Sequence, residues 1–209
     1  MFDVEFFFKT FWLSFKALPV NLKITAVAFA VGTALGFLIA LCRIHKIKVL
    51  SQVCAFLVSF IRGTPVVLQI LVVYSIIPSL LNSILKNAGS SIDVFKINPI
   101  VYAYIVFSLN NTVILSEVFR SALLTVSKGQ FEAGITCGLT SCQTYRRIII
   151  PQALESALPN ICNATVNLIK NTSLAFMMTV KDITAVARIE ASYGYNYIES
   201  YLDIFVIYI

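Results

Sequence analysis

Long runs of apolar residues, separated by short clusters of charges, dominate the pattern along the chain. Residues 24–42, 63–85 and 97–116 are uncharged, and basic or mixed polar segments separate them. A run of about 20 apolar residues is long enough to cross the hydrocarbon core of a bilayer as a helix. The pattern therefore predicts an all-α integral membrane protein with at least three spans.

Two further segments complete the predicted set. Residues 148–180 form a long segment that contains Pro151 and Pro159, and residues 191–209 begin a fifth span. Because no basic cluster closes the fifth span, we expect a short C-terminal piece beyond residue 209. Five spans place the two ends of the chain on opposite sides of the membrane.

The first 19 residues differ from the spans because aromatic side chains alternate with charges. Trp12 and its aromatic neighbours occur among Asp3, Glu5 and Lys9. This pattern is typical of a helix that lies in the bilayer interface. Pro19 is expected to separate this interfacial helix from the first span.

The composition agrees with a membrane location. The chain is 58% hydrophobic and 12% charged, with a net charge of +6, and an ordinary soluble domain has about twice that charged share. Lys and Arg in a membrane protein mark cytoplasmic loops, so no nucleic-acid partner is expected. Five scattered cysteines and one histidine form no ligand pattern, so no metal site is expected.

The placement of the basic residues predicts the orientation. Residues 43–48 and residues 120–147 are rich in Lys and Arg, whereas the two lysines of the 86–96 loop are offset by Asp93. Positively charged loops face the cytoplasm. We therefore expect the N-terminus outside and the loop after the third span inside.

A motif of small and acidic residues occupies that predicted cytoplasmic loop. It consists of Glu132, Ala133 and Gly138, followed after nine residues by Ile148 and then by Pro151. This spacing resembles the Glu-Ala-Ala…Gly…Ile-x-Leu-Pro loop, the EAA motif, of permease subunits in bacterial ATP-binding-cassette (ABC) importers. The chain departs mildly from the pattern, since one Gly replaces the second Ala and one Ile replaces Leu.

The physical chemistry of the motif agrees with that resemblance. A short helix with small side chains can sit closely in a groove of a partner protein. Gly138 is expected to end the helix or let it turn, and Glu132 is expected near its start, where the helix dipole favours a carboxylate. Such a rigid coupling helix transmits motion of a partner to the flanking spans.

Three other segments are similar to the amino-acid branch of the same family. Residues 59–65 resemble its Phe-x-Arg-Gly-Thr-Pro segment, residues 116–123 its Ala-Glu-x-x-Arg-Gly-Ala-Leu segment, and residues 170–174 its Lys-x-Thr-Ser-Leu segment. The resemblance covers nearly the whole chain. It implies that residues 1–209 form one transmembrane domain of a type I importer, with residues 125–145 as the cytoplasmic coupling loop.

The resemblance also implies partners. These are two ATPase subunits, a second permease subunit that is identical or paralogous, and an extracytoplasmic solute-binding protein, all at a bacterial inner or plasma membrane. The chain has no phosphate-binding loop, so it is expected to be no enzyme and to hold no cofactor, while ATP and Mg²⁺ bind the partner. The residues expected to couple to the ATPase are Gly129, Gln130, Glu132, Ala133 and Gly138.

Charges inside apolar segments cost about 2.5–3.5 kcal/mol each on insertion scales and are therefore candidates for function. Arg62 and Glu117 have similar expected depths, so they are predicted to pair and, with Arg120, to form a gate or anchoring cluster. A static interfacial ion pair is the alternative. Thr64 and Pro65 are expected to break the helix beside the translocation path, although a kink that serves packing alone remains open.

Amide side chains form a stripe on the fourth segment. Asn163, Asn167 and Lys170 share one helical face, which must meet protein or a water-filled path because lipid cannot satisfy it. Asn110 and Glu117 share a face of the third span. We expect these residues and Thr172 to line the path for a zwitterionic substrate, and helix–helix packing is the alternative role.

Together these features predict the transmembrane subunit of an ATP-driven importer of polar amino acids. Overall likeness favours a cystine-like substrate, with the basic amino acids arginine, lysine and histidine as the alternative. An ion-coupled amino-acid transporter is a further alternative, although it would need more spans or an internal repeat.

Overall fold

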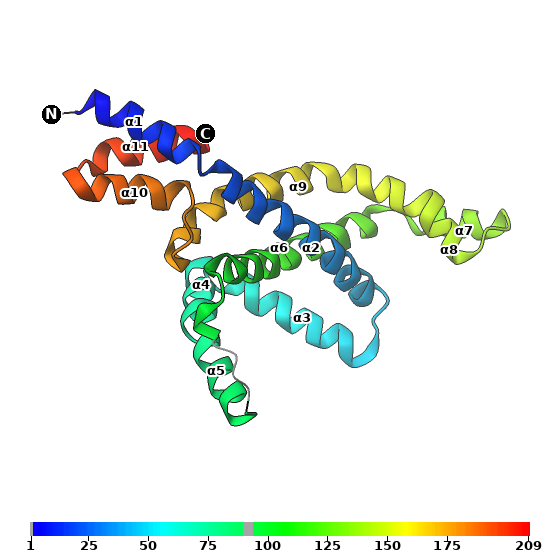
Figure 1. Cartoon of the computed structure of the whole chain (residues 1–209). Coiled ribbons are helices and arrows are strands. Elements are labelled where there is room, and N and C mark those ends of the chain that lie inside the picture. Colours follow the sequence, from blue (N-terminus) through cyan, green and yellow to red (C-terminus); the bar gives the residue numbers. More distant parts are fainter. Residues whose placement is uncertain (1, 90–93) are drawn as a thin grey trace. The chain divides into compact units, whose positions relative to one another are not determined.

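The computed structural model describes residues 2–89 and 94–209, and the described residues form helices without any strand (Figure 1). The predicted all-α fold is confirmed, while Asp93 lies outside the described residues. The elements are α1 (Val4–Phe15), α2 (Leu18–Ile44), α3 (Lys48–Gly63), α4 (Val66–Ser75), α5 (Ile77–Asn87), η1 (Val94–Lys96), α6 (Pro99–Thr125), α7 (Lys128–Thr136), α8 (Ser141–Thr144), η2 (Tyr145–Ile149), α9 (Ile150–Asn171), η3 (Thr172–Met178), α10 (Ile183–Gly194) and α11 (Tyr197–Tyr208).

Three helical segments in the described part of the chain are long and apolar enough to cross a membrane. They are Val4–Ile44, Val66–Asn87 and Pro99–Thr125. These segments contain the first predicted run, 24–42, and cover most of the other two, 63–85 and 97–116. The fourth and fifth spans, which correspond to α9 and α11, stay predictions.

The chain divides into two compact units, each built from segments that are distant in sequence. Unit 1 comprises Met1–Ala28, Thr64–Ser108 and Asn167–Ile209, and unit 2 comprises Phe29–Gly63 and Leu109–Val166. Three of the four boundaries fall within α2, α6 and α9, so these long helices contribute to both units, and the fourth follows the end of α3.

The N-terminal helix is separate from α2, but the break differs from the one predicted. The chain turns at Lys16 and Ala17, and Pro19 lies in the first turn of α2. A proline is tolerated there because the first N–H groups of a helix have no partner within it. Pro19 therefore starts a helix instead of ending one.

Within unit 1, α1 packs against α10 and α11 (Figure 1). The Asp3 N–H donates to Glu199 Oε1 at 2.9 Å. The protein-facing side of α1 is polar, with Thr10 and Ser14 fully buried, whereas Trp12 on the opposite side is 63% exposed. This outward aromatic face is what the predicted interfacial helix requires.

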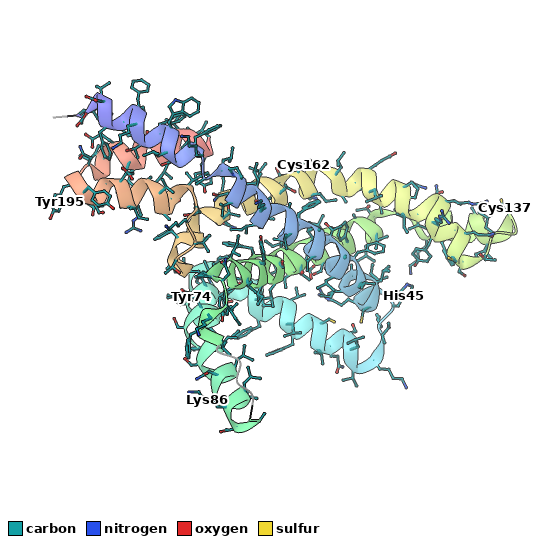
Figure 2. All side chains as sticks on the ribbon, viewed as in Figure 1. His45, Tyr74, Lys86, Cys137, Cys162 and Tyr195 are labelled. Carbon is teal, nitrogen blue, oxygen red and sulfur yellow. The ribbon has the colours of Figure 1, made fainter. Side chains whose placement is uncertain are left out.

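The predicted fifth span over 191–209 is interrupted in the structure. Helix α10 ends at Gly194, Tyr195 adopts a left-handed φ of 60°, and α11 begins at Tyr197. Tyr195 lies at the far end of α10 in Figure 2. A left-handed residue cannot continue a helix, so only α11 could belong to a span.

Within unit 2, α2 and α6 approach closely at two glycines. A β-carbon on Gly32 would lie 2.5 Å from Asn111 Nδ2, and one on Gly36 would lie 2.9 Å from the carbonyl oxygen of Thr112. Small residues four apart allow membrane helices to bring their backbones together. Sequence analysis did not identify this pair, although its spacing was visible.

Helix α6 also extends further than the apolar run predicted. It continues through Glu117 to Thr125, so the mixed segment from Glu117 onward is helix before it is loop. The inward face of this extension is apolar, since Leu115 and Phe119 lie in one hydrophobic cluster and Ala122 in another. Burial of these side chains favours helix beyond the point where the hydropathy falls.

Candidate functional site

The sequence motif lies on α7, a nine-residue helix that exposes most of the motif residues. Gly129, Gln130, Glu132 and Ala133 are all exposed. Cys137, labelled in Figure 2, caps the helix at the tip of the segment formed by α7 and α8. An exposed helix with small side chains on its surface can enter a groove of another protein.

Gly138 ends α7, as the sequence predicted. Its φ is +82°, its N–H donates to the Ile135 carbonyl oxygen at 2.9 Å, and the Leu139 N–H donates to the Gly134 carbonyl oxygen at 3.1 Å. These paired bonds and the left-handed residue define a Schellman C-cap, a conformation that favours glycine. Gly138 therefore acts through its backbone, since no neighbouring atom crowds its α-carbon.

The expected position of Glu132 was wrong. Helix α7 begins at Lys128, after the N-cap residue Ser127, so Glu132 is the fifth residue and lies outside the first turn. The helix dipole acts mainly within the first and last turns. It gives little stabilisation to this carboxylate, which is exposed and available to a partner.

Helix α7 is braced by the segment that follows it. Gly134 is buried against Thr144, the last residue of α8. A capping box fixes the start of α8, because the Gln143 N–H donates to Thr140 Oγ1 and the Thr140 N–H donates to Gln143 Oε1. The loop of residues 137–140 is therefore held at both ends, and α7 and α8 form one rigid hairpin.

Glu117 is the centre of a charged cluster in unit 2. Its Oε2 accepts from Arg120 Nη2 at 2.9 Å and from Arg120 Nε at 3.1 Å, while its Oε1 accepts from Arg43. The side chains of Glu117 and Arg43 are 19% and 18% exposed. Two guanidinium groups therefore neutralise one half-buried carboxylate.

The predicted pair of Arg62 with Glu117 was wrong. Among the described residues, Glu117 forms ion pairs with Arg43 and Arg120, and none with Arg62, whose side chain is exposed. In the sequence, Arg43 has the character of the basic end of the first span. Its place at the end of an apolar helix, at the same expected depth as Glu117, was the signal that could have identified it.

The helix break at Thr64 and Pro65 is present. Helix α3 ends at Gly63 and α4 begins at Val66, with Pro65 as its N-cap. The Gln69 Nε2 donates to the Thr64 carbonyl oxygen and to Thr64 Oγ1, both at 3.0 Å. A side-chain amide thus satisfies one carbonyl oxygen that the broken helix releases.

The polar stripe occupies one side of α9. Asn163, Asn167 and Lys170 are exposed, whereas the opposite side carries buried small and apolar residues such as Ala157 and Leu168. Asn110 of α6 is half-buried. The stripe therefore lies on the exposed side of α9, opposite its buried residues.

Thr172 belongs to a buried polar cluster that sequence analysis missed. Asn21 Nδ2 donates to Thr172 Oγ1 at 3.1 Å and to Tyr208 Oη at 2.7 Å, and Asn21 Oδ1 accepts from the Ile183 N–H at 3.2 Å. One asparagine in α2 therefore joins the start of η3, the start of α10 and the end of α11. Thr172 is fully buried, so a direct contact with substrate would require this cluster to open.

Asp182 lies next to that cluster and caps α10. Its Oδ1 accepts from the Ala185 N–H at 2.7 Å, and its Oδ2 is buried and has no hydrogen-bond partner among the residues that the structure describes. Burial raises the pKa of this carboxyl to about 7 because removal from water disfavours the charged form. Hydrogen bonds to the carboxylate, first among them the one from the Ala185 N–H, oppose that shift only in part.

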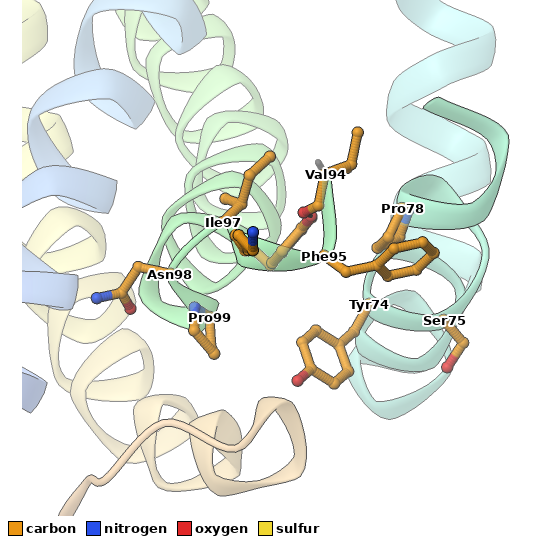
Figure 3. A pocket seen from close by; sticks show the side chains of 10 residues that line it. Tyr74, Ser75, Pro78, Val94, Phe95, Ile97, Asn98 and Pro99 are labelled. Atoms are coloured by element: carbon orange, nitrogen blue, oxygen red, sulfur yellow. Dashed lines mark hydrogen bonds between the residues drawn. The ribbon is translucent and has the colours of Figure 1, made fainter. Parts of the chain in front are cut away.

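A separate cavity of about 480 Å³ lies in unit 1, between α4, α5, η1 and the start of α6 (Figure 3). Tyr74 and Tyr102 form its aromatic wall with their ring centroids 5.7 Å apart. Of the described residues that line it, none was predicted from sequence to line the path.

The five cysteines form no disulfide, and no group of metal-binding side chains converges within residues 2–89 and 94–209.

These features define an all-α membrane protein that presents an exposed helical hairpin between two of its long helices. Residues 32–209 match the model of the family described as binding-protein-dependent transport system inner membrane component. The chain belongs to this family.

Named relatives and a solved structure confirm the resemblance to the amino-acid branch. The chain is 35% identical over 206 residues to the probable amino-acid permease protein YxeN of Bacillus subtilis, covering 99% of this chain and 88% of that one. It is 35% identical over 191 residues to the L-cystine transport system permease protein TcyL of the same organism, covering 91% and 77%. A crystal structure of an amino acid ABC transporter with histidines superposes with a TM-score of 0.81 at 28% identity, covering 100% and 91%.

Proposed function

We propose that this chain is the transmembrane permease subunit of an ATP-driven amino-acid importer. The observation that carries the proposal is the braced helix α7, which exposes Gly129, Gln130, Glu132 and Ala133 on its surface. In the proposed complex α7 enters a groove of the ATPase, which binds ATP and Mg²⁺. The permease itself supplies the path and performs no chemistry.

The complex contains two ATPase subunits, a second permease subunit and an extracytoplasmic binding protein. The distribution of Lys and Arg supports an orientation with α7 in the cytoplasm and the N-terminus outside. The outward aromatic face of α1, with Trp12 at its centre, then lies at the outer surface of the membrane.

The translocated substrate is a polar amino acid, and a cystine-like substrate is favoured. The exposed amides of Asn163 and Asn167 can both donate and accept hydrogen bonds, and Lys170 can attract a carboxylate. Glu117 is already engaged by Arg43 and Arg120, so it offers no free carboxylate to a cationic side chain. This argues for a zwitterionic substrate over arginine or lysine, and the likeness to an L-cystine permease points the same way.

Copurification and ligand binding test the proposal. An ATPase subunit should copurify with the tagged permease. The cognate binding protein should bind cystine more tightly than the other amino acids. Failure of any ATPase to copurify would refute the importer, whereas preference of the binding protein for arginine would refute only the substrate.

A glycine substitution tests the role of α7. Gly138→Leu should lower substrate-stimulated ATP hydrolysis by roughly tenfold, because a residue with a β-carbon is strained at this left-handed φ and disrupts the helix end. Cys137→Ala, at the exposed neighbouring position, is the matched control, and the ATPase partner should hydrolyse ATP at the normal rate with this variant. Normal transport by Gly138→Leu would exclude the proposed coupling.

A further inference from the structure

Three aromatic rings connect the coupling helix with the end of α2. The ring centroids of Phe131 in α7 and Tyr145 in η2 are 5.6 Å apart, and those of Tyr145 and His45 are 5.9 Å apart. Both separations are within the range of favourable tilted ring contacts. Phe131, Tyr145 and His45, here called the ring ladder, thus link two segments that the sequence keeps far apart.

The α2 end of the ring ladder is fixed by a helix cap. The Lys46 N–H donates to the Arg43 carbonyl oxygen at 3.4 Å and the Ile47 N–H to the Cys42 carbonyl oxygen at 3.2 Å. Lys46 has a φ of +49°. This is again a Schellman cap, here with a lysine in place of glycine, and it fixes the backbone of His45 at the C-cap position, directly after Ile44.

The other end of the ring ladder moves with α7. Tyr145 directly follows Thr144, which packs against Gly134 of α7. Tyr145 also begins η2, a π-helical turn over Tyr145–Ile149. Such turns are rare and often occur at functional sites. A displacement of α7 by a partner therefore displaces the Tyr145 ring through Phe131 and Thr144.

From His45 the contact continues to α6. Arg43 lies two residues before His45 in the same helical turn, and its guanidinium group pairs with Glu117. The end of α2 is thus tied to α6 by an ion pair that is largely shielded from water. A displacement of the His45 ring would therefore be transmitted to both α2 and α6.

We propose that His45 and Tyr145 are positioning residues that pass displacement of the coupling helix to α2 and α6. This inference rests on the proposed function, in which α7 contacts an ATPase. His45 is exposed and Tyr145 is half-buried, so neither ring fills the core. Their contacts stabilise the position of one segment relative to another, and this is the property that coupling requires.

The test uses the complete transporter, with both permease subunits, the ATPase and the binding protein, reconstituted in liposomes. The probe is a mixture of radiolabelled L-amino acids that includes L-cystine, and the readout is the number of molecules transported for each ATP hydrolysed. His45→Ala and Tyr145→Ala should lower this ratio about three- to tenfold, the loss expected for one aromatic contact. His45→Phe and Tyr145→Phe retain the rings and should keep the ratio.

Matched variants separate the ring contact from general damage. Tyr193→Ala removes a ring that is 80% exposed on α10, and it should leave the ratio unchanged. His45→Leu and Tyr145→Leu keep bulk without a ring and replace the alanine variants if those fail to assemble. The double variant His45→Ala/Tyr145→Ala should be no worse than either single one, because one break already interrupts the ladder.

The outcomes distinguish this inference from the proposed function. If the unsubstituted transporter shows no ATP hydrolysis stimulated by the binding protein, the proposed function fails. If that stimulation is present and the ratio of His45→Ala or its leucine replacement stays within about twofold of normal, the ring ladder is refuted. Equal loss in the phenylalanine and alanine variants also refutes it, because the ring contact would then be irrelevant.

Discussion

Gly134 lies so close to Thr144 that a β-carbon at position 134 would come within 2.6 Å of the threonine methyl group and 2.9 Å of its hydroxyl. Thr144 is fully buried, and its hydroxyl donates to the Thr140 carbonyl oxygen at 3.0 Å. The threonine therefore cannot turn away without losing that bond. This contact explains why glycine occupies a motif position where the family pattern has alanine.

Substitution of Gly134 should therefore be harmful even by the residue that the family pattern prefers. Gly134→Ala should destabilise the α7–α8 hairpin by about 1–3 kcal/mol, the usual cost of overpacking, and lower stimulated ATP hydrolysis. Thr144→Ala removes both close atoms, so the double variant should recover most of the lost activity. Thermal unfolding and ATPase assays in nanodiscs measure both effects. Unchanged stability and ATP hydrolysis in Gly134→Ala would show that the α7–α8 hairpin can accommodate the added methyl group.

The partners of Glu117 can be distinguished by double-mutant cycles. Glu117→Gln combined with Arg43→Gln should show a coupling energy of more than about 1 kcal/mol in stability, because each single variant removes the same ion pair, which is largely shielded from water. The cycle with Arg62→Gln should be additive, since Arg62 forms no ion pair with Glu117. Coupling to Arg62 of similar size would instead support the pair expected from sequence.

Exposure of the α9 stripe can be measured by cysteine reactivity. Asn163→Cys and Asn167→Cys should react with a small water-soluble thiol reagent, and substrate delivered by the binding protein should slow the reaction. Ile161→Cys is the matched control on the half-buried side and should react slowly. The native cysteines must be replaced first, because Cys137, Cys142 and Cys162 are exposed. If Asn163→Cys and Asn167→Cys react as slowly as Ile161→Cys in every nucleotide state, the stripe serves helix packing and does not line the path.

Asp182 should make stability depend on pH. Burial raises the folded-state pKa of this carboxyl to about 7 from an ordinary value of 3.8. The contribution of the neutral carboxyl to folding stability is therefore complete below the unfolded-state pKa, and it is lost as the pH rises through the folded-state pKa. The melting temperature of the unsubstituted protein should therefore fall relative to Asp182→Asn between about pH 4 and pH 7, then level off. A constant difference across this range would show that the carboxyl does not titrate there.

Sequence periodicity was sufficient for the class of fold and for much of the coupling segment. A long uncharged run such as residues 97–116 has one stable solution in a bilayer, since a helix satisfies every backbone group internally. Gly138 was also predictable, because only a left-handed residue ends a helix in this way and glycine adopts that conformation at least cost. These inferences depend on local physical chemistry alone.

Helix ends were less predictable because hydropathy reports lipid exposure and not helix length. Glu117 ends the apolar run, yet α6 continues to Thr125 because Phe119 and Ala122 pack against neighbouring helices. Likewise, Pro19 has the character of a helix breaker in isolation, but at the second position of α2 it is compatible with a helix start. Packing decided each of these boundaries.

The sequence by itself determined that this protein is an all-α membrane component of the binding-protein-dependent transport family, because apolar run length and motif spacing are properties of the chain alone. Only the tertiary structure decided which distant residues meet. Arg43 rather than Arg62 neutralises Glu117, and Asn21 binds both Thr172 and Tyr208. Such pairs depend on the rotation and depth of each helix against its neighbours, and interatomic packing sets those quantities to fractions of an ångström.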